Sequence, residues 1–403
     1  MNCRSQRSRK SESMIEDLEI TKSKAGPAAA DPPAELASMT RAELEAWCRS
    51  EGLPAYRGAQ IFQAIHRGLR FPEMTNLPLF LREALSEKAV DQPARIVLRR
   101  ESALDGTLKV LISLRDGNCV EAVLMRYEYG LTLCISTQVG CRMGCRFCAS
   151  TLGGLVRNLT AGEMLGEILA VNRLLRDRAA APNQPAAAPN QSALAAQPAA
   201  APDRVSRVVL MGSGEPLDNY DEVMRFLRLL REEGGVNISL RNVSLSTCGL
   251  VERMEQLAEE NLPVTLCVSL HAPNDAIRRR TMPVANRYRI DEILRACRHY
   301  VDKTGRRVIF EYALSEGVNS LPAHAEELAR RLRGLQCHVN LIPLNAVPER
   351  NLPGVPEETV RRFLETLRKN HISATRRREM GDDIEGACGQ LRRKHLHDLS
   401  PRS

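Results

Sequence analysis

The segment Cys134-Ile-Ser-Thr-Gln-Val-Gly-Cys141-Arg-Met-Gly-Cys145-Arg-Phe-Cys148 carries four cysteines within fifteen residues, and the last three form a CxxxCxxC triplet. Thiolates are soft ligands that prefer iron–sulfur chemistry, zinc or copper to hard cations. An electron-carrying [4Fe–4S] cluster takes four cysteines, one on each iron. A triplet would leave one iron without a protein ligand, and an open coordination position is typical of a catalytic site. The spacing therefore favours an enzyme with a cluster.

Two other interpretations of the triplet remain open. A zinc site normally takes two ligand pairs, and the sequence contains no second CxxC and no HxxxH. The triplet can also be a chance match, because short motifs carry that risk. Five cysteines stand alone in apolar or helical stretches and are interpreted as packed side chains. They are Cys48, Cys119, Cys267, Cys297 and Cys337.

Length and composition bound the class of protein. With 403 residues, 43% of them hydrophobic, the chain can bury one large α/β domain and a small accessory domain. No stretch approaches 18 uncharged apolar residues, and the polar amino terminus lacks the apolar run of a signal peptide. We therefore expect a cytoplasmic protein with no membrane partner, whose cysteines stay reduced.

The chain is basic, with a net charge of +8 and a pI near 9.0. Lys and Arg gather in four clusters, Arg278–Arg280, Arg306–Arg307, Arg376–Arg378 and Arg392–Lys394. Such clusters suit a polyanion, because neutralised phosphates release their counterions. A solvated basic surface is the alternative. Aromatic residues are only 4% of the chain, so a stacking platform for single-stranded nucleic acid is not expected.

The amino-terminal third predicts a small helical unit. Residues 1–34 have the Ser-, Lys-, Ala- and Pro-rich composition of a disordered segment. Thr40-Arg-Ala-Glu43 is a capping-box pattern that opens a helix, and helical segments are also expected at 56–67 and 78–88. We expect residues 35–105 to form a helical accessory domain with a connector. β-favouring runs follow at 107–114 and 119–126.

From Leu131 onward, strands alternate with helices. Strands are expected at 131–137, 205–211, 242–246, 264–270, 307–313, 338–343 and 372–376. Helices are expected at 160–175, 220–231 and 290–300, and from residues 251, 323 and 357. Six βα units predict an α/β fold, a partial (βα)6 barrel over 106–376 with helices outside a parallel sheet. A low-complexity insertion at 179–203 and a C-terminal tail at 377–403 complete this plan.

Polar motifs follow four of these strands, at the edge where parallel α/β folds bind ligands. They are Met211-Gly-Ser-Gly214-Glu215-Pro-Leu217, Ser246-Thr-Cys-Gly249, Ser269-Leu270-His271-Ala-Pro-Asn274 and Pro343-Leu-Asn345. The Glu215 carboxylate suits a ligand's ammonium group, and the Asn345 amide suits an adenine or ribose edge. Taken singly, the 211–217 motif is also typical of a tight turn, and His271 of a buried structural imidazole. Together, beside a cysteine loop, they predict one ligand site.

The tail carries one further cysteine, in Gly381-Asp-Asp-Ile-Glu-Gly-Ala-Cys388-Gly-Gln-Leu391. A buried structural cysteine would more often lie inside an apolar run. Cys388 is therefore predicted to be accessible and reactive. Cys134, which lies outside the triplet, could be its redox partner.

These motifs resemble those of radical S-adenosylmethionine enzymes of the RlmN/Cfr family of RNA adenine methyltransferases. The resemblance covers about residues 40–392, apart from the insertion, and rests on VGCRMGCRFC, MGSGEPL, LSTCG, SLHAPND, IPLN and GDDIEGACGQL. It implies a [4Fe–4S] cluster held by Cys141, Cys145 and Cys148, whose open iron binds S-adenosylmethionine. It also implies cofactor contacts from Gly214, Glu215, Ser246, Ser269, Leu270, His271 and Asn345, and an accessory domain that holds folded RNA.

The resemblance further implies three catalytic residues and two molecules of S-adenosylmethionine per turnover. Cys388 would accept a methyl group from the first molecule. The second would be cleaved reductively, giving a radical that takes hydrogen from this methyl group before the carbon adds to adenine. Cys134 would attack Cys388 to release the product through a transient disulfide, and Glu121 would accept the proton. Without the resemblance, Glu121 is an ordinary strand carboxylate.

The implied reaction is methylation of C2 of an adenosine in the peptidyl-transferase centre of 23S rRNA and of the adenosine 3′ to the tRNA anticodon. A close alternative methylates C8 of the same rRNA adenosine, as in the antibiotic-resistance branch. We favour C2 because it is the commoner housekeeping activity. An alternative of a different class is a non-catalytic, zinc-dependent RNA-binding protein. Flavodoxin or ferredoxin is the expected electron donor, and a monomer is expected.

Overall fold

The computed structural model describes residues 33–180, 204–343, 354–378 and 380–384. Its strands are β1 (Ala34–Glu35), β2 (Ala89–Val90), β3 (Ala94–Glu101), β4 (Leu108–Leu114), β5 (Cys119–Tyr127), β6 (Gly130–Ile135), β7 (Gln138–Gly140), β8 (Leu155–Asn158), β9 (Val205–Leu210), β10 (Val243–Thr247), β11 (Thr265–Ser269), β12 (Val308–Leu314), β13 (Cys337–Pro343) and β14 (Ala374–Arg376). Its α-helices are α1 (Arg41–Ser50), α2 (Tyr56–His66), α3 (Leu79–Lys88), α4 (Ala161–Ala180), α5 (Tyr220–Arg231), α6 (Val251–Glu259), α7 (Asp275–Thr281), α8 (Ile290–Thr304), α9 (Pro322–Leu332) and α10 (Glu357–Lys369).

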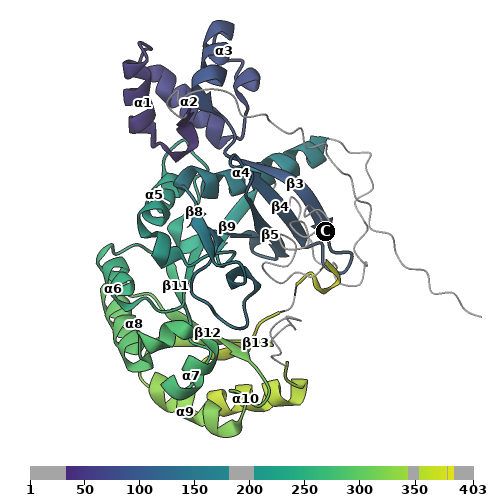
Figure 1. Cartoon of the computed structure of the whole chain (residues 1–403), viewed down its shortest axis with the longest axis vertical. Helices are drawn as coiled ribbons and strands as arrows, with labels where there is room; N and C mark the ends of the chain where they lie inside the picture. The colour runs from purple at the N-terminus through teal and green to yellow at the C-terminus, as the bar shows by residue number, and fades with distance from the viewer. Residues whose placement is uncertain (1–32, 181–203, 344–353, 379, 385–403) are drawn as a thin grey trace, which may run out of the picture.

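Ten of these strands form one sheet, in the order β14-β13-β12-β11-β10-β9-β6-β5-β4-β3. The strands from β6 to β14 pair in parallel, whereas β3, β4 and β5 extend the sheet with antiparallel pairs. Figure 1 shows the sheet curling into a crescent with α5, α6, α8, α9 and α10 along its outer side. Because β14 and β3 do not pair in this order, the described sheet is an open barrel. This confirms the predicted partial (βα)6 barrel.

One face of the sheet packs in the hydrophobic core and the other lines a cavity, as the residues of β12 show. Val308, Phe310 and Tyr312 belong to the main hydrophobic core. Glu311 and Ala313 line a cavity on the other face. This alternation follows from the two-residue period of a strand. The inner face of the crescent is therefore open to a ligand, while the outer face is sealed by helices.

Helices α1, α2 and α3 form a helical module at one end of the molecule (Figure 1). The predicted capping box opens α1, because Glu43 N donates to Thr40 Oγ1 at 3.3 Å and Thr40 N donates to the Glu43 carboxylate at 2.7 Å. The module contacts α4, where Arg173 donates to the Gly68 carbonyl at 3.1 Å and pairs with Glu73 at 2.6 Å. The three helices expected at 40–88 are confirmed.

Several features of the fold were not predicted. Strand β3 is rich in arginine, and it pairs with β4 at the edge of the large sheet. Strands β7 and β8 pair across the cysteine loop, and each is too short to leave a periodic pattern. Helix α7 follows the Ser269–Asn274 motif directly, with the Asn274 side chain accepting from Ile277 N at 3.0 Å as its cap. The helix expected at 160–175 continues to Ala180.

The described part of the tail lies against the turn between β3 and β4. Gly381 N donates to Asp105 Oδ2 at 3.0 Å, and Ala103 N donates to Asp383 Oδ2 at 2.8 Å. The tail therefore runs from β14, at one edge of the sheet, to the strands at the other edge (Figure 1). The expected segments 1–34 and 179–203 lie almost wholly outside the described residues.

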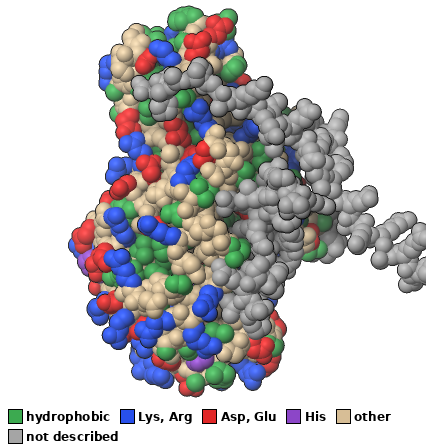
Figure 2. Space-filling view, in the orientation of Figure 1, with side chains coloured by type: hydrophobic (Ala, Val, Ile, Leu, Met, Phe, Trp, Pro, Cys, Tyr) green, Lys and Arg blue, Asp and Glu red, His purple; other side chains and the backbone are tan. Residues whose placement is uncertain are grey.

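The surface in Figure 2 shows Lys and Arg side chains interspersed with Asp and Glu along the helical edge of the molecule. On this face, the basic side chains do not form one continuous stripe. In the described ranges, no helix has the length and apolar character needed to cross a membrane.

Candidate active site

The cysteine loop is closed at its base by the β7–β8 hairpin. Gly140 has a φ of 79°, and a Cβ at this position would lie 2.0 Å from the Gly154 oxygen. Only glycine therefore allows the two strands to approach this closely. Cys141 N donates to the same Gly154 oxygen at 2.9 Å. Within the loop, Thr151 Oγ1 donates to the Cys145 carbonyl at 3.1 Å, which fixes the middle of the triplet.

The triplet lies in the wall of a cavity of about 350 Å³ on the inner face of the sheet. Cys141 and Cys145 of this triplet are buried, and Cys148 is half-buried. Burial raises the pKa of Cys141 to about 12, and the nearby Glu215 carboxylate acts in the same direction. The predicted site residues that line this one cavity are Cys134, Cys141, Cys145, Cys148, Gly214, Glu215, Ser246, Ser269 and His271.

Glu215 connects three of the predicted motifs. Its Oε2 accepts from Cys248 N at 2.7 Å, its Oε1 accepts from Leu217 N at 3.1 Å, and its own N–H donates to Gln138 Oε1 at 2.9 Å. Burial raises the pKa of Glu215, while hydrogen bonds from Cys248 and Thr247 lower it. A buried carboxylate in a cavity wall is best stabilised by a cation. This position fits the predicted contact with an ammonium group.

The loop after β9 is tied to the cysteine loop by further contacts. Gln138 Nε2 donates to Asp218 Oδ2 at 2.9 Å, and the Arg142 guanidinium also pairs with Asp218. Gly214 has a φ of 111°, and a Cβ there would lie 2.7 Å from Thr137 Oγ1. Glycine at position 214 is thus required by the packing of these two segments.

His271 is a neutral hydrogen-bond donor at the cavity wall. Its Nδ1 accepts from Ala313 N at 2.9 Å. Burial, together with the charge of Arg278, lowers its pKa to about 3. Because Nδ1 is an acceptor, the neutral ring carries its proton on Nε2. His271 therefore offers an N–H group to a ligand and does not act as a base at neutral pH.

Arg278 corrects the prediction of a basic surface cluster at 278–280, because its side chain is fully buried. Its Nε donates to the Leu270 carbonyl at 3.2 Å, and its Nη2 donates to the Cys248 carbonyl at 2.5 Å. One guanidinium thus joins the loops that follow β10 and β11. Three consecutive arginines carry no signal that one of them is internal, so this positioning residue was missed. Arg279 and Arg280 are exposed.

Glu121 does not line the cavity. It lies on β5 in a buried ion pair with Lys109 of β4, with 3.1 Å between Oε2 and Nζ. Val123, two residues further along β5, pairs with Cys134 on β6 and does line the cavity. Met380 of the tail packs in the same apolar cluster as Cys134. The structure therefore brings the tail to Cys134. Glu121 lies two residues along β5 from Val123, which is part of the cavity wall.

The other predicted site residues have different placements. Leu270 belongs to the hydrophobic core, and its N–H donates to the Glu311 carbonyl at 3.1 Å. Asn345 and Cys388 lie outside the described residues. Glu311, which was not predicted, lines the cavity, and Asn340 Nδ2 donates to its Oε2 at 3.0 Å. Burial raises the pKa of Glu311.

The chemistry of the donor set fits a [4Fe–4S] cluster with one open iron. Three thiols from one loop line one cavity, and each would bind a different iron. Over the described ranges, no group of three or more His, Cys, Asp and Glu side chains could hold a metal ion. A cluster does not require its cysteines to meet at one atom. Beside the triplet, a buried carboxylate, two serines and an imidazole N–H suit the polar groups of an amino acid and a nucleoside.

An open parallel barrel with three cysteines on the loop after its first parallel strand defines a radical S-adenosylmethionine enzyme. In agreement, residues 135–332 match the family described as the Radical SAM superfamily. Residues 34–90, which include the helical module, match the Ribosomal RNA large subunit methyltransferase N-terminal domain.

The chain is similar to relatives over most of its length. It is 48% identical over 365 residues to the probable dual-specificity RNA methyltransferase RlmN of Alkaliphilus oremlandii, covering 90% of this chain and 99% of that protein. The Clostridium perfringens protein of the same name is 46% identical, with 90% and 97% covered. A crystal structure of a radical SAM methyltransferase from Sphaerobacter thermophilus matches with a TM-score of 0.80 at 44% identity, covering 89% and 99%. The chain belongs to the RlmN family. This membership supports an enzyme and rejects the alternative interpretation as a non-catalytic, zinc-dependent RNA-binding protein.

Proposed function

We propose that this chain is an RNA methyltransferase that adds a methyl group to C2 of an adenosine in 23S rRNA and of the adenosine 3′ to the anticodon in tRNAs. The convergence of the cysteine triplet, Glu215 and His271 on one cavity carries this proposal. The relatives that it matches along 90% of its length are named dual-specificity RNA methyltransferases. Those names favour the C2 activity over the C8 alternative.

Cys141, Cys145 and Cys148 would hold a [4Fe–4S] cluster, which when bound supplies the electron that cleaves S-adenosylmethionine. Two molecules of S-adenosylmethionine would be used per turnover. Glu215 lies next to the triplet and would accept hydrogen bonds from the ammonium group of S-adenosylmethionine. Gly214 lines the same cavity, and its backbone would contact this cofactor. The remaining cofactor contacts would come from Ser246, Ser269, Leu270, His271 and Asn345. Leu270 can contribute only its backbone, because its side chain is in the core.

Cys388 would take the methyl group from S-adenosylmethionine as a thioether. Met380 supports this assignment, because it packs beside Cys134 in the cavity wall. Cys388 follows Met380 by eight residues, and eight extended residues reach at most about 29 Å. The thiol is thus within range of the cavity.

Cys134 and Glu121 would complete the reaction after the methyl carbon has joined the base. The Cys134 thiolate would attack the Cys388 sulfur, release the product and form a transient disulfide. Glu121 would take the proton from the adenine carbon. The ion pair with Lys109 holds the Glu121 carboxylate on β5, close to the strand position that faces Cys134.

The helical module within residues 35–105 would hold folded RNA, the core at 106–376 would carry out catalysis, and the tail at 377–403 would bring Cys388 to the cavity. Exposed arginines such as Arg279 and Arg280 suit phosphate contacts that position the RNA. A flavodoxin or ferredoxin would supply the electron, and the enzyme would act as a monomer.

Mass spectrometry of nucleosides tests the regiochemistry. The chain is expressed in a host that lacks its own enzyme of this family, and 23S rRNA and tRNA are digested and compared with those from a Cys145→Ala variant. We expect 2-methyladenosine in both RNAs with the wild-type chain and none with the variant. 8-Methyladenosine would instead establish the alternative activity, and neither product would reject both.

A further inference from the structure

A second cavity lies at the opposite end of the barrel strands from the cysteine triplet. Its volume is about 970 Å³. It is lined by residues near the start of five strands, namely Thr132, Arg207, Ser244, Thr265 and Ile309. Later residues on the same strands line the active-site cavity, such as Leu210 of β9 and Glu311 of β12. The two cavities therefore occupy the two ends of the inner face.

Positive charge gathers in this second cavity without compensation. Four arginines line it, Arg207, Arg241, Arg306 and Arg307, and the described residues of its lining include no Asp or Glu. Within the described chain, none of the four forms an ion pair with a carboxylate. Clustered guanidinium groups repel one another, and an anion between them relieves that repulsion.

Two of these arginines are held in place by other groups. The Arg207 guanidinium lies 4.6 Å above the Tyr129 ring. Arg306 donates to the Val264 carbonyl at 3.2 Å and to Thr265 Oγ1 at 2.8 Å. Less conformational freedom is lost when pre-positioned guanidinium groups bind a ligand, and their fork geometry matches phosphate oxygens. The cavity therefore presents fixed as well as exposed cationic groups.

Thr132 gives an independent indication of a ligand. Its side chain lines the cavity and is only 6% exposed, yet its Oγ1 has no hydrogen-bond partner among the described residues. Thr132 is directly opposite Arg207 in the register of β6 and β9. Buried hydroxyl groups in native proteins are normally satisfied. An oxyanion bound beside Arg207 would accept from this hydroxyl.

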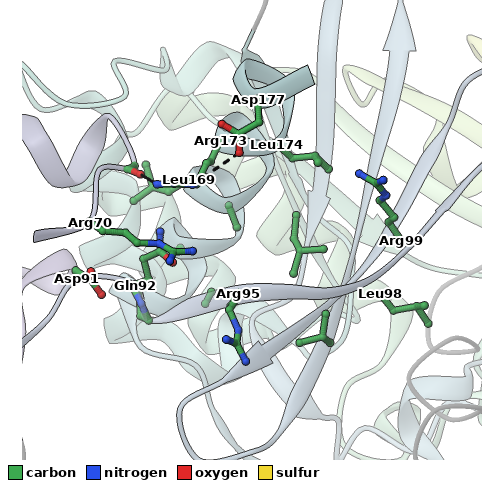
Figure 3. A pocket seen from close by; sticks show the side chains of 17 residues that line it. Arg70, Asp91, Gln92, Arg95, Leu98, Arg99, Leu169, Arg173, Leu174 and Asp177 are labelled. Carbon is green, nitrogen blue, oxygen red and sulfur yellow. Dashed lines mark hydrogen bonds and ion pairs between the residues drawn. The ribbon is translucent and has the colours of Figure 1, made fainter. Parts of the chain in front are cut away.

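A different cavity, of about 240 Å³ between α4 and β3, shows that arginines alone do not make such a site. Figure 3 shows Arg70, Arg95, Arg99 and Arg173 there, with Asp91 and Asp177 also in the lining. Arg173 is bound to Glu73 at 2.6 Å and to Asp177 at 3.8 Å. Arg173 is thus paired with carboxylates of the protein, unlike the described arginines in the cavity of Arg207.

We propose that the cavity lined by Thr132 and Arg207 binds the phosphate groups of a ligand. Guanidinium forks and one hydroxyl donor are the groups that recognise phosphate oxygens. A cavity of this size accommodates a nucleotide. The phosphates could belong to a free small molecule or to the backbone of an RNA substrate, and only the RNA source rests on the proposed function.

Calorimetric titration of the full chain with pyrophosphate at low salt tests the small-molecule source. Filter binding of a 23S rRNA fragment tests the RNA source. The Arg207→Gln/Arg241→Gln double variant should lose at least tenfold in affinity for whichever probe binds. An Arg295→Gln/Arg298→Gln double variant is the matched control, because it removes the same charge from exposed positions on α8.

Thr132→Val supplies a second variant with little change in side-chain shape. It should weaken binding several-fold without lowering the thermal unfolding midpoint, because a hydroxyl without a partner is removed. Loss of pyrophosphate binding in the Arg207→Gln/Arg241→Gln variant supports a free small molecule as the ligand. Loss of RNA binding alone in this variant supports the backbone of an RNA substrate. If neither probe distinguishes this variant from the control, the proposal is overturned. Pyrophosphate binding does not depend on methylation, so its outcome is separate from that of the proposed function.

Discussion

Phe147 packs edge-on against His271, with ring centroids 4.6 Å apart and ring planes inclined by 74°. Phe147 is the residue before the last cysteine of the triplet, and His271 follows β11. The contact thus joins the cluster loop to a wall of the ligand cavity. Edge-to-face pairs of this kind contribute about 1 kcal/mol beyond their buried area.

Replacing the ring of Phe147 should therefore disturb the cofactor site. Phe147→Leu keeps an apolar side chain but removes the edge contact, so we expect weaker binding of S-adenosylmethionine and about 1 kcal/mol less stability. Phe147→Tyr keeps the ring and should resemble the wild type. Equilibrium binding of the cofactor to reconstituted protein measures the effect. Equal affinities for all three proteins would contradict the assigned role of this contact.

Replacing Arg278 should cause a large loss of stability, although Arg278 is not among the described residues that line the active-site cavity. Arg278→Gln leaves the carbonyls of Cys248 and Leu270 without their charged donor, which should cost about 3 kcal/mol. Arg279→Gln, one residue along, changes an exposed side chain and should cost less than about 0.5 kcal/mol. Denaturant unfolding of both variants measures the difference. Similar values would mean that Arg278 does not hold the two loops.

The buried Lys109–Glu121 pair makes a prediction about charge. Lys109→Met leaves the Glu121 carboxylate buried without its cation, which should destabilise the protein by about 3 kcal/mol or more. The double variant Lys109→Met/Glu121→Gln buries no charge and should recover most of this loss. A thermodynamic cycle of the two single variants and the double variant measures the coupling. A double variant no more stable than Lys109→Met would show that the pair is not the cause.

The buried His66 side chain should make the free energy of unfolding depend on pH. Burial lowers its pKa to about 4, from an ordinary value of 6.5. Between these values the unfolded chain binds a proton that the folded chain excludes, so stability falls as the pH falls. From pH 7.0 to 5.5, His66 should account for a loss of about 1 kcal/mol. Unfolding free energies at both pH values should show a smaller loss in His66→Gln than in the wild type, and equal losses would refute the assignment.

Much of the barrel could be predicted because its elements are locally encoded. Helix α5 matches the expected range 220–231, and the capping box at Thr40 forms as the pattern indicates. The strand-end motifs meet at one cavity because parallel strands end at one edge of a sheet. The resemblance to a family then assigned roles that spacing alone could not.

What could not be predicted depends on partners that are distant in the sequence. Arg278 is internal because two backbone carbonyls from different loops accept hydrogen bonds from its guanidinium group. Glu121 is paired because Lys109 lies on the neighbouring strand, and nothing near Glu121 in the sequence signals this. The cavity around Thr132 appears only when five strands are assembled. Such features follow from tertiary packing, which local patterns do not contain.

We expect a cluster held by Cys141, Cys145 and Cys148 to cleave S-adenosylmethionine in order to methylate RNA. The most direct measurement uses anaerobically reconstituted protein with S-adenosylmethionine, dithionite and a 23S rRNA fragment. We predict that 5′-deoxyadenosine and 2-methyladenosine both form, and that Cys145→Ala yields neither. Wild-type protein that carries its iron–sulfur absorption but forms no 5′-deoxyadenosine would contradict this account.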